Sequence, residues 1–169
     1  MSLSGPETTM ASAPKITPCL WFDFNAEEAV EHYIRIFGNS RIVDVLRYDE
    51  NIPQHAGRVL MIRFELEGQP FQALNGGSQF PFTEAISLSV DCADQAEVDA
   101  LWTKLTAGGS PSACSWLKDK FGVSWQIVPR VLVEMLRDPD AKKAARAMQA
   151  MMGMGKIDIA RLRAAFADP

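Results

Sequence analysis

Few side chains in this sequence of 169 residues are of types that carry out chemistry on their own. The only two histidines are His32, on the polar face of a predicted helix, and His55, in a polar loop. A divalent metal site needs imidazole, carboxylate or thiolate ligands that converge on one point. Nothing in the pattern brings the histidines together, so we interpret both as solvated surface residues and expect no metal site and no cofactor.

The cysteines give no stronger signal. Cys19, Cys92 and Cys114 are odd in number and lack the close spacing of zinc or redox motifs. This usage is typical of buried or partly buried thiols in a reducing cytosol, and we favour a role as small core residues over catalysis.

Composition excludes several classes of partner. The net charge is −4, and lysines and arginines are scattered along the chain, so no nucleic-acid partner is expected. No run approaches the ~18 apolar residues of a membrane span, and the first fifteen residues lack the order of a signal peptide. These features favour a soluble, cytoplasmic protein with no membrane contact.

The elements that must position any site come from a unit that occurs twice. Thr17 to Gly38 and Glu84 to Gly109 each read as an apolar strand, a polar corner and an amphipathic helix that ends near glycine. At a spacing of about seventy residues, Glu28 pairs with Glu97 and Tyr33 with Trp102. The repeat predicts two βαβββ modules.

The first module is predicted as a strand over 16–24, a helix capped by Asn25, a strand over 41–48 and a hairpin that turns at Gly68 and Gln69. The buried stripe of its helix comprises Ala26, Ala29, Val30, Tyr33 and Phe37. In the second module the corresponding stripe is Val98, Leu101, Trp102 and Leu105, and strands follow around 114–117 and 123–128.

The sequence divides into three segments. Residues 1–14 are rich in Ser, Thr, Ala and Pro and are predicted to be disordered. Residues 15–130 form one domain, with modules at about 15–78 and 84–130. Residues 131–169 form a helical extension, with a short helix at 131–136, a helix begun at Asp138 and Pro139, and a last helix from Asp158 with Ile159, Leu162 and Phe166 on one face.

The phrases ALNGG, AISLSVDC, SWLKDKFGVSWQIVPR and AMQAMMGMGKIDIARL resemble the vicinal-oxygen-chelate superfamily, which includes glyoxalase I, bleomycin-resistance proteins and extradiol dioxygenases. Within it the chain is similar to the PhnB-like branch, often labelled 3-demethylubiquinone-9 3-methyltransferase domain. The resemblance spans about Ile16 to Phe166. It implies an α+β, glyoxalase-like fold in which eight strands curl into an open cup with helices on the convex side.

The resemblance also implies where a metal would bind. Metal-dependent members carry ligands on the first and fourth strands of each module, and these positions fall here at Pro18, Ala85, Ala73 and Gln126. None supplies an imidazole or a carboxylate, although Gln126 offers one carbonyl oxygen. Glu84 lies one residue from the expected register, so a displaced site built from Glu84 and Gln126 stays as an alternative.

Strand alternation then sorts residues toward the cup. If Gln126 faces inward, Ser124 and Val128 do too, while Trp125 and Ile127 pack under the helices. Trp116 and Lys118 stand near the rim; each also has a plain structural interpretation, Trp116 as a core residue and Lys118 with Asp119 as a turn with a surface ion pair. The predicted ligand-binding residues are Phe22, Phe71, Asn75, Ser87, Trp116, Lys118 and Gln126.

This wall is mostly apolar with a few amide and hydroxyl groups and one ammonium, which suits a flat apolar or aromatic ligand. It lacks a convincing acid/base pair or activated nucleophile, so no catalytic residue is assigned. We therefore expect a metal-free protein that binds a small apolar or aromatic molecule and forms a homodimer.

Three alternatives remain open. The family label implies a methyltransferase acting on a demethylubiquinone-like ring, but the glycine pairs at 75–77, 107–109 and 153–155 do not follow a first parallel strand, as a dinucleotide-type fold requires. The second alternative is a metal-dependent lyase or isomerase with a displaced site. The third is a partner-binding protein whose methionine-rich C-terminal helices form the contact surface.

Overall fold

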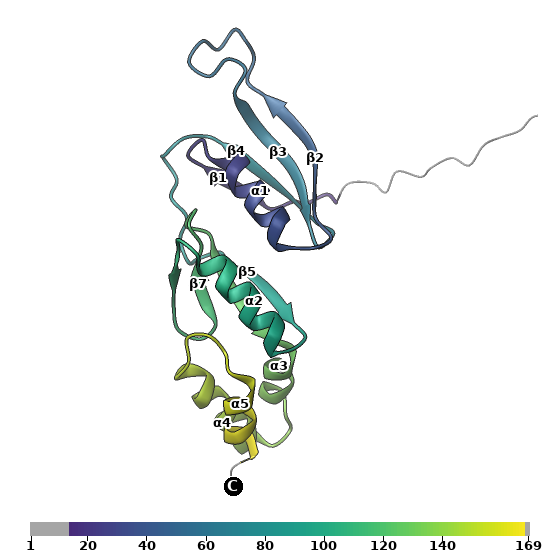
Figure 1. Cartoon of the computed structure of the whole chain (residues 1–169), viewed down its shortest axis with the longest axis vertical. Helices are drawn as coiled ribbons and strands as arrows, with labels where there is room; N and C mark the ends of the chain where they lie inside the picture. Colours follow the sequence, from purple (N-terminus) through teal and green to yellow (C-terminus); the bar gives the residue numbers. More distant parts are fainter. Residues whose placement is uncertain (1–13, 168–169) are drawn as a thin grey trace, which may run out of the picture. The chain divides into compact units, whose positions relative to one another are not determined.

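The computed structural model describes residues 14–167 and divides the chain into two compact units, one ending at Gly77 and the other starting at Ser78 (Figure 1). Apart from Pro14, the segment predicted to be disordered lies outside the described residues.

Each unit contains one four-stranded sheet. The first comprises β1 (Cys19–Phe22), β2 (Arg41–Arg47), β3 (Val59–Leu66) and β4 (Gln69–Asn75), in the order β1-β4-β3-β2. The second comprises β5 (Leu88–Cys92), β6 (Ser110–Pro111), β7 (Trp116–Lys118) and β8 (Ser124–Pro129), in the order β5-β8-β7-β6.

The strand pairing is the same in both sheets. The first strand pairs in parallel with the fourth, and the other neighbours pair antiparallel. This shared topology confirms the two βαβββ modules and the α+β class predicted from the repeat. Strand β6 was not predicted, because two residues are too few to show alternation.

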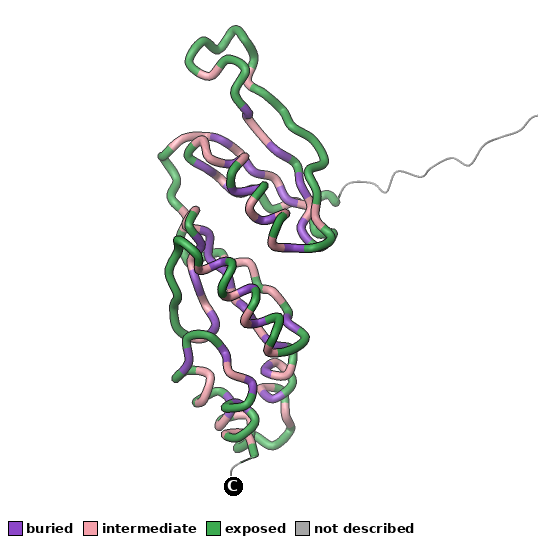
Figure 2. Tube along the Cα trace, in the orientation of Figure 1, coloured by how far each residue is buried: buried purple, intermediate pink, exposed green. Residues whose placement is uncertain are grey.

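One helix covers a face of each sheet. Helix α1 (Ala26–Ile36) buries Ala26, Ala29, Val30 and Tyr33 completely, and Phe37 follows it into the core, as predicted (Figure 2). Helix α2 (Gln95–Thr106) buries Val98, Leu101 and Leu105 and half-buries Trp102.

The start of α1 corrects one prediction. Asn25 occupies the N-cap position, but its side chain makes no capping hydrogen bond. The first helical amide, Ala26 N, instead donates to Asn75 Oδ1 at 3.0 Å, so a side chain from β4 satisfies it. Helix α2 has a local cap, because Asp94 Oδ1 accepts from Glu97 N at 2.9 Å.

The hairpin between β3 and β4 turns one residue earlier than predicted. Glu67 and Gly68 both have positive φ, 47° and 77°, which is the pattern of a type I′ turn between antiparallel strands.

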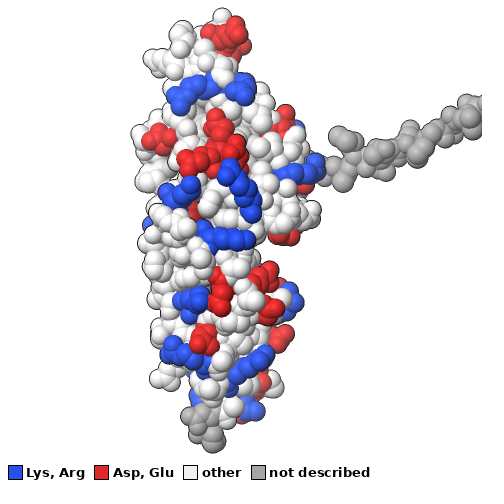
Figure 3. Space-filling view, in the orientation of Figure 1, with Lys and Arg blue, Asp and Glu red and all other residues white. Residues whose placement is uncertain are grey.

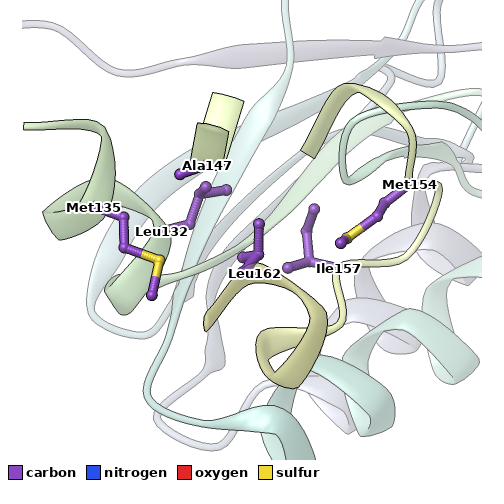
Figure 4. Packing of buried hydrophobic residues seen from close by; sticks show 6 residues of the cluster. All are labelled: Leu132, Met135, Ala147, Met154, Ile157 and Leu162. Carbon is purple, nitrogen blue, oxygen red and sulfur yellow. The ribbon is translucent and has the colours of Figure 1, made fainter. Parts of the chain in front are cut away.

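Three helices complete the second unit: α3 (Arg130–Leu136), α4 (Ala141–Met152) and α5 (Ile159–Ala167). The three helices pack together around a buried hydrophobic cluster (Figure 4). It comprises Leu132, Met135, Ala147, Met154, Ile157 and Leu162. Val128 of β8 packs against this cluster, so the helices are anchored to the second sheet. Helix α4 begins later than predicted, with Asp140 as its cap.

Candidate functional site

The predicted ligand residues of the first module lie in its core. Phe22, Phe71 and Asn75 are 2%, 7% and 2% exposed. Asn75 Nδ2 donates to Glu27 Oε2 at 2.7 Å and to Val59 O at 3.0 Å, and Oδ1 binds the start of α1, so this face of the sheet is the one that α1 covers. The prediction that these residues face a hollow is therefore wrong. Alternation groups residues on one face but does not say which face the helix covers.

The ALNGG phrase has a packing explanation. A Cβ added to Gly76 would lie 2.2 Å from the Trp21 ring, and Trp21 Nε1 donates to Gly77 O at 2.7 Å. Only glycine fits beneath the indole at position 76.

In the second module the alternation predicted for β8 holds at residues 125–127, whereas Val128, predicted to face the hollow, packs against the cluster of α3, α4 and α5. Trp125 and Ile127 of β8 are 2% and 0% exposed, whereas Gln126 between them is half-buried. In the β7–β8 register Trp116 pairs with Gln126 and Lys118 with Ser124, and residues paired in this way share a face. Trp116, Lys118 and Gln126 therefore lie together on one side of the sheet.

Ser87 joins this group from the segment before β5. Gln126 Nε2 donates to Ser87 Oγ at 2.8 Å, which fixes the amide against the hydroxyl. Gln126 is thus engaged with Ser87, and Glu84, the other proposed ligand of a displaced metal site, is engaged with Lys118. Within residues 14–167 no group of three or more His, Cys, Asp or Glu side chains is placed to hold a metal ion.

An open pocket of about 460 Å³ lies in this unit. Its lining residues come from the segment before β5, from β6 to β7, and from β8: Glu84, Ser110, Pro111, Ser112, Ala113, Cys114, Trp116, Leu117, Lys118 and Ser124. Of the seven predicted ligand residues, Trp116 and Lys118 line it. Sequence reasoning missed the 110–114 segment, which carries no motif.

The ion pair in the pocket differs from the one considered from sequence. Lys118 Nζ lies 2.7 Å from Glu84 Oε1, and this hydrogen bond lowers the pKa of Glu84. Asp119 instead is buried: its carboxylate accepts from Phe121 N, Val123 N and Trp125 Nε1 at 2.9, 3.0 and 2.8 Å. The interpretation of Lys118 and Asp119 as a surface ion pair is therefore wrong.

Ser124 contributes a buried hydroxyl to the pocket lining. The residue is 2% exposed, and its Oγ has no hydrogen-bond partner in the described part of the chain. Buried hydroxyls are normally paired, so this one can bind a group that enters the pocket.

The pocket rim is held by the C-terminal extension. Cys114 and Ser115 both have positive φ, 56° and 68°, which side chains other than glycine rarely adopt. Cys114 N donates to Met154 O at 2.8 Å, and Ser115 N to Gly155 O at 2.9 Å. These two bonds fix the rim segment in an otherwise unfavourable conformation.

The histidines are less exposed than predicted. Both are half-buried, and the His55 ring stacks on Phe24 at 4.8 Å and contacts Tyr48 at 5.1 Å between ring centroids. His55 therefore packs into an aromatic cluster of the first unit, and its interpretation as a solvated loop residue is wrong.

The surface charge and the hydropathy of the helices bear on possible partners. On the face shown in Figure 3, basic and acidic side chains are interspersed, and neither sign forms an extended patch among the described residues. Of the helices between residues 14 and 167, none is long and apolar enough to cross a membrane.

Comparison with known proteins shows which family this chain belongs to. A family model described as 3-demethylubiquinone-9 3-methyltransferase matches residues 14–128. The chain belongs to this family. This family is the PhnB-like branch that the sequence resembles. The match ends within β8, so α3 to α5 lie beyond the part that the family model describes.

One solved structure carries the same family description, and a second shares the fold. The PhnB protein from Bacillus cereus, which carries the same description, is 39% identical, with a TM-score of 0.63, over 69% of this chain and 99% of that chain. A Pseudomonas aeruginosa protein is 22% identical, with a TM-score of 0.56, over 69% and 98%.

A more distant relative shares the fold alone. The fosfomycin resistance protein FosX from Listeria monocytogenes is 16% identical, with a TM-score of 0.52, over 76% of this chain and 100% of that chain. No curated protein matches the sequence.

Proposed function

We propose that this protein binds a small molecule with a flat apolar or aromatic body in the pocket of its second module. The observation that carries the proposal is the pocket itself, where the half-buried indole of Trp116 stands beside a few polar groups. Pockets for small organic ligands combine such an apolar wall with a small number of placed hydrogen-bonding groups.

Binding is favoured over acid/base catalysis because the charged groups of the pocket are engaged with each other. The Glu84 carboxylate is bound by Lys118, and this hydrogen bond lowers the pKa of Glu84, away from the range in which a general base works best. The second module therefore offers recognition groups but no evident proton-transfer pair.

Methyl transfer from a nucleoside cofactor is not favoured, despite the family description. Each sheet has a single parallel pair of strands, and one glycine in each of the first two candidate pairs, Gly76 and Gly109, leaves no room for a Cβ. A Cβ at Gly76 meets Trp21, one at Gly109 meets Lys118 O at 2.1 Å, and one at Gly155 meets Ser112 O at 3.3 Å. These glycines have structural roles that explain them without a cofactor, and we propose none.

The proposal retains two further expectations. We expect a homodimer, which light scattering coupled to size-exclusion chromatography tests. We also expect the protein to work in the reducing cytoplasm, in line with its three free cysteines.

Fluorescence titration with the neutral probe N-phenyl-1-naphthylamine tests the binding function. We expect saturable binding that weakens by about tenfold in Trp116→Ala, since aromatic contacts contribute about 1 kcal/mol beyond the area they bury. Trp102→Phe on α2 serves as the tryptophan control and should bind as the wild type does. Absence of saturable binding by a folded wild-type protein would rule out the proposal.

A further inference from the structure

We infer that the pocket selects ligands that carry a carboxylate, which Lys118 and Ser124 hold while the ligand's flat body lies against Trp116. This inference rests on the proposed function and adds the chemical class of the ligand.

The first argument is the placement of donors across three strands. Ser110 of β6 pairs in register with Lys118 of β7, and Lys118 pairs with Ser124 of β8. Cross-strand partners point to the same face and lie within about 4.5–5.5 Å of each other between Cβ atoms. The sheet therefore presents a hydroxyl, an ammonium and a second hydroxyl in one row along the pocket wall.

The second argument is the state of the Ser124 hydroxyl. It is buried and has no partner among residues 14–167, although a buried hydroxyl without a hydrogen bond costs free energy. A ligand oxygen beside Lys118 would accept the Ser124 proton and remove this cost. An anionic oxygen gains most, because hydrogen bonds to charged acceptors are stronger than those to neutral ones.

The third argument is that the ammonium already holds a carboxylate. Glu84 Oε1 lies 2.7 Å from Lys118 Nζ, and the Glu84 side chain is 66% exposed in the segment before β5. Exposed ion pairs contribute little to stability, so a ligand carboxylate that also binds Ser124 can replace Glu84 at Lys118. Glu84 and Lys118 are the charged residues that line the pocket, so Glu84 is the intramolecular competitor of the ligand.

The test uses two compounds with the same ring system, 2-naphthoate and neutral 2-naphthylmethanol, each displacing N-phenyl-1-naphthylamine from the full-length protein at pH 7.5. We expect 2-naphthoate to bind at least about tenfold more tightly, as charge-assisted hydrogen bonds predict. Lys118→Met should abolish this preference, Lys118→Arg should preserve most of it, and Ser124→Ala should reduce it several-fold.

Glu84→Gln distinguishes competition between Glu84 and the ligand from a purely structural role of the Glu84–Lys118 ion pair. Removing the competing charge should tighten 2-naphthoate binding and leave 2-naphthylmethanol binding unchanged. Thermal melting confirms that each variant is folded, and the Lys118 variants test the inference independently of Ser124.

The outcomes separate the two proposals. If the neutral probe binds but the two naphthalene compounds bind equally, the carboxylate inference is overturned and the binding function stands. If neither the probe nor either compound binds the folded protein, both are overturned. A naphthoate preference that survives Lys118→Met also overturns the inference.

Discussion

Asn75 shows how one polar side chain can hold a module together. It is 2% exposed and connects the first turn of α1, through Ala26 N and Glu27, with the carbonyl of Val59 at the start of β3. Asn75 was predicted to bind a ligand, and its partners could not be predicted because they lie 16 to 49 positions away in the chain.

Asn75→Ala should therefore lower stability and not merely ligand affinity. It leaves a buried N–H and a buried C=O without their partner, and we expect a loss of about 2–4 kcal/mol in the free energy of unfolding, measured by urea denaturation. Gln72→Ala, on the opposite face of β4, is the matched control and should change stability by less than about 0.5 kcal/mol. Equal effects of the two substitutions would contradict the role assigned to Asn75.

Cys92 predicts a pH dependence of stability. Burial raises the pKa of its thiol from an ordinary value of 9.0 to about 12, and the nearby carboxylates of Glu97, Asp91 and Asp94 add to the shift. Between these values the unfolded chain releases the thiol proton and the folded protein keeps it. The contribution of Cys92 to stability is therefore present below pH 9 and is lost as pH rises toward 12.

Urea denaturation at pH 8 and pH 10.5 measures this effect. Stability of the wild type should fall more over this interval than that of Cys92→Ala, whose cavity cost does not depend on pH. Parallel losses in the two proteins would show that other groups account for the alkaline sensitivity.

Among the elements, the start of α2 holds the start of α5 through the side chain of Gln95. Gln95 Oε1 accepts from Ile159 N at 2.8 Å, and Nε2 donates to Ile157 O at 3.0 Å. Gln95→Ala should destabilise the protein by about 1–2 kcal/mol and speed hydrogen exchange at the start of α5, because a helical amide loses its acceptor. Gln149→Ala, on the exposed side of α4, should leave the exchange of Ile159 unchanged.

Elements that extend over several turns were predicted correctly from the sequence, whereas very short elements were missed. The buried stripe of α1 spans three turns, so the helix and the buried residues from Ala26 to Phe37 were predicted correctly. Strand β6 has two residues and no detectable alternation, and it forms one side of the pocket. The pocket was therefore only half predictable: Trp116 and Lys118 follow from the β7 pattern, whereas the 110–114 rim depends on distant contacts.

At the scale of the whole molecule, the segment beyond the family match supports the pocket. The rim residues Cys114 and Ser115 are bound by the backbone of Met154 and Gly155, between α4 and α5. That segment is anchored in turn by the buried Met154 and Ile157 side chains of the cluster that α3, α4 and α5 share (Figure 4). The extension is thus a structural part of the second module.

Ile157→Ala tests this dependence, because it opens a cavity under the segment that holds the rim. We expect a loss of about 2–5 kcal/mol in stability, faster hydrogen exchange at Cys114 and Ser115, and weaker binding of N-phenyl-1-naphthylamine under conditions where the protein is folded. Leu105→Ala, an equally buried substitution on α2, should cost similar stability but leave probe affinity unchanged. If both variants weaken binding in proportion to their stability loss, the effect is general loosening of the unit; a loss confined to Ile157→Ala assigns the positioning of the rim to the extension.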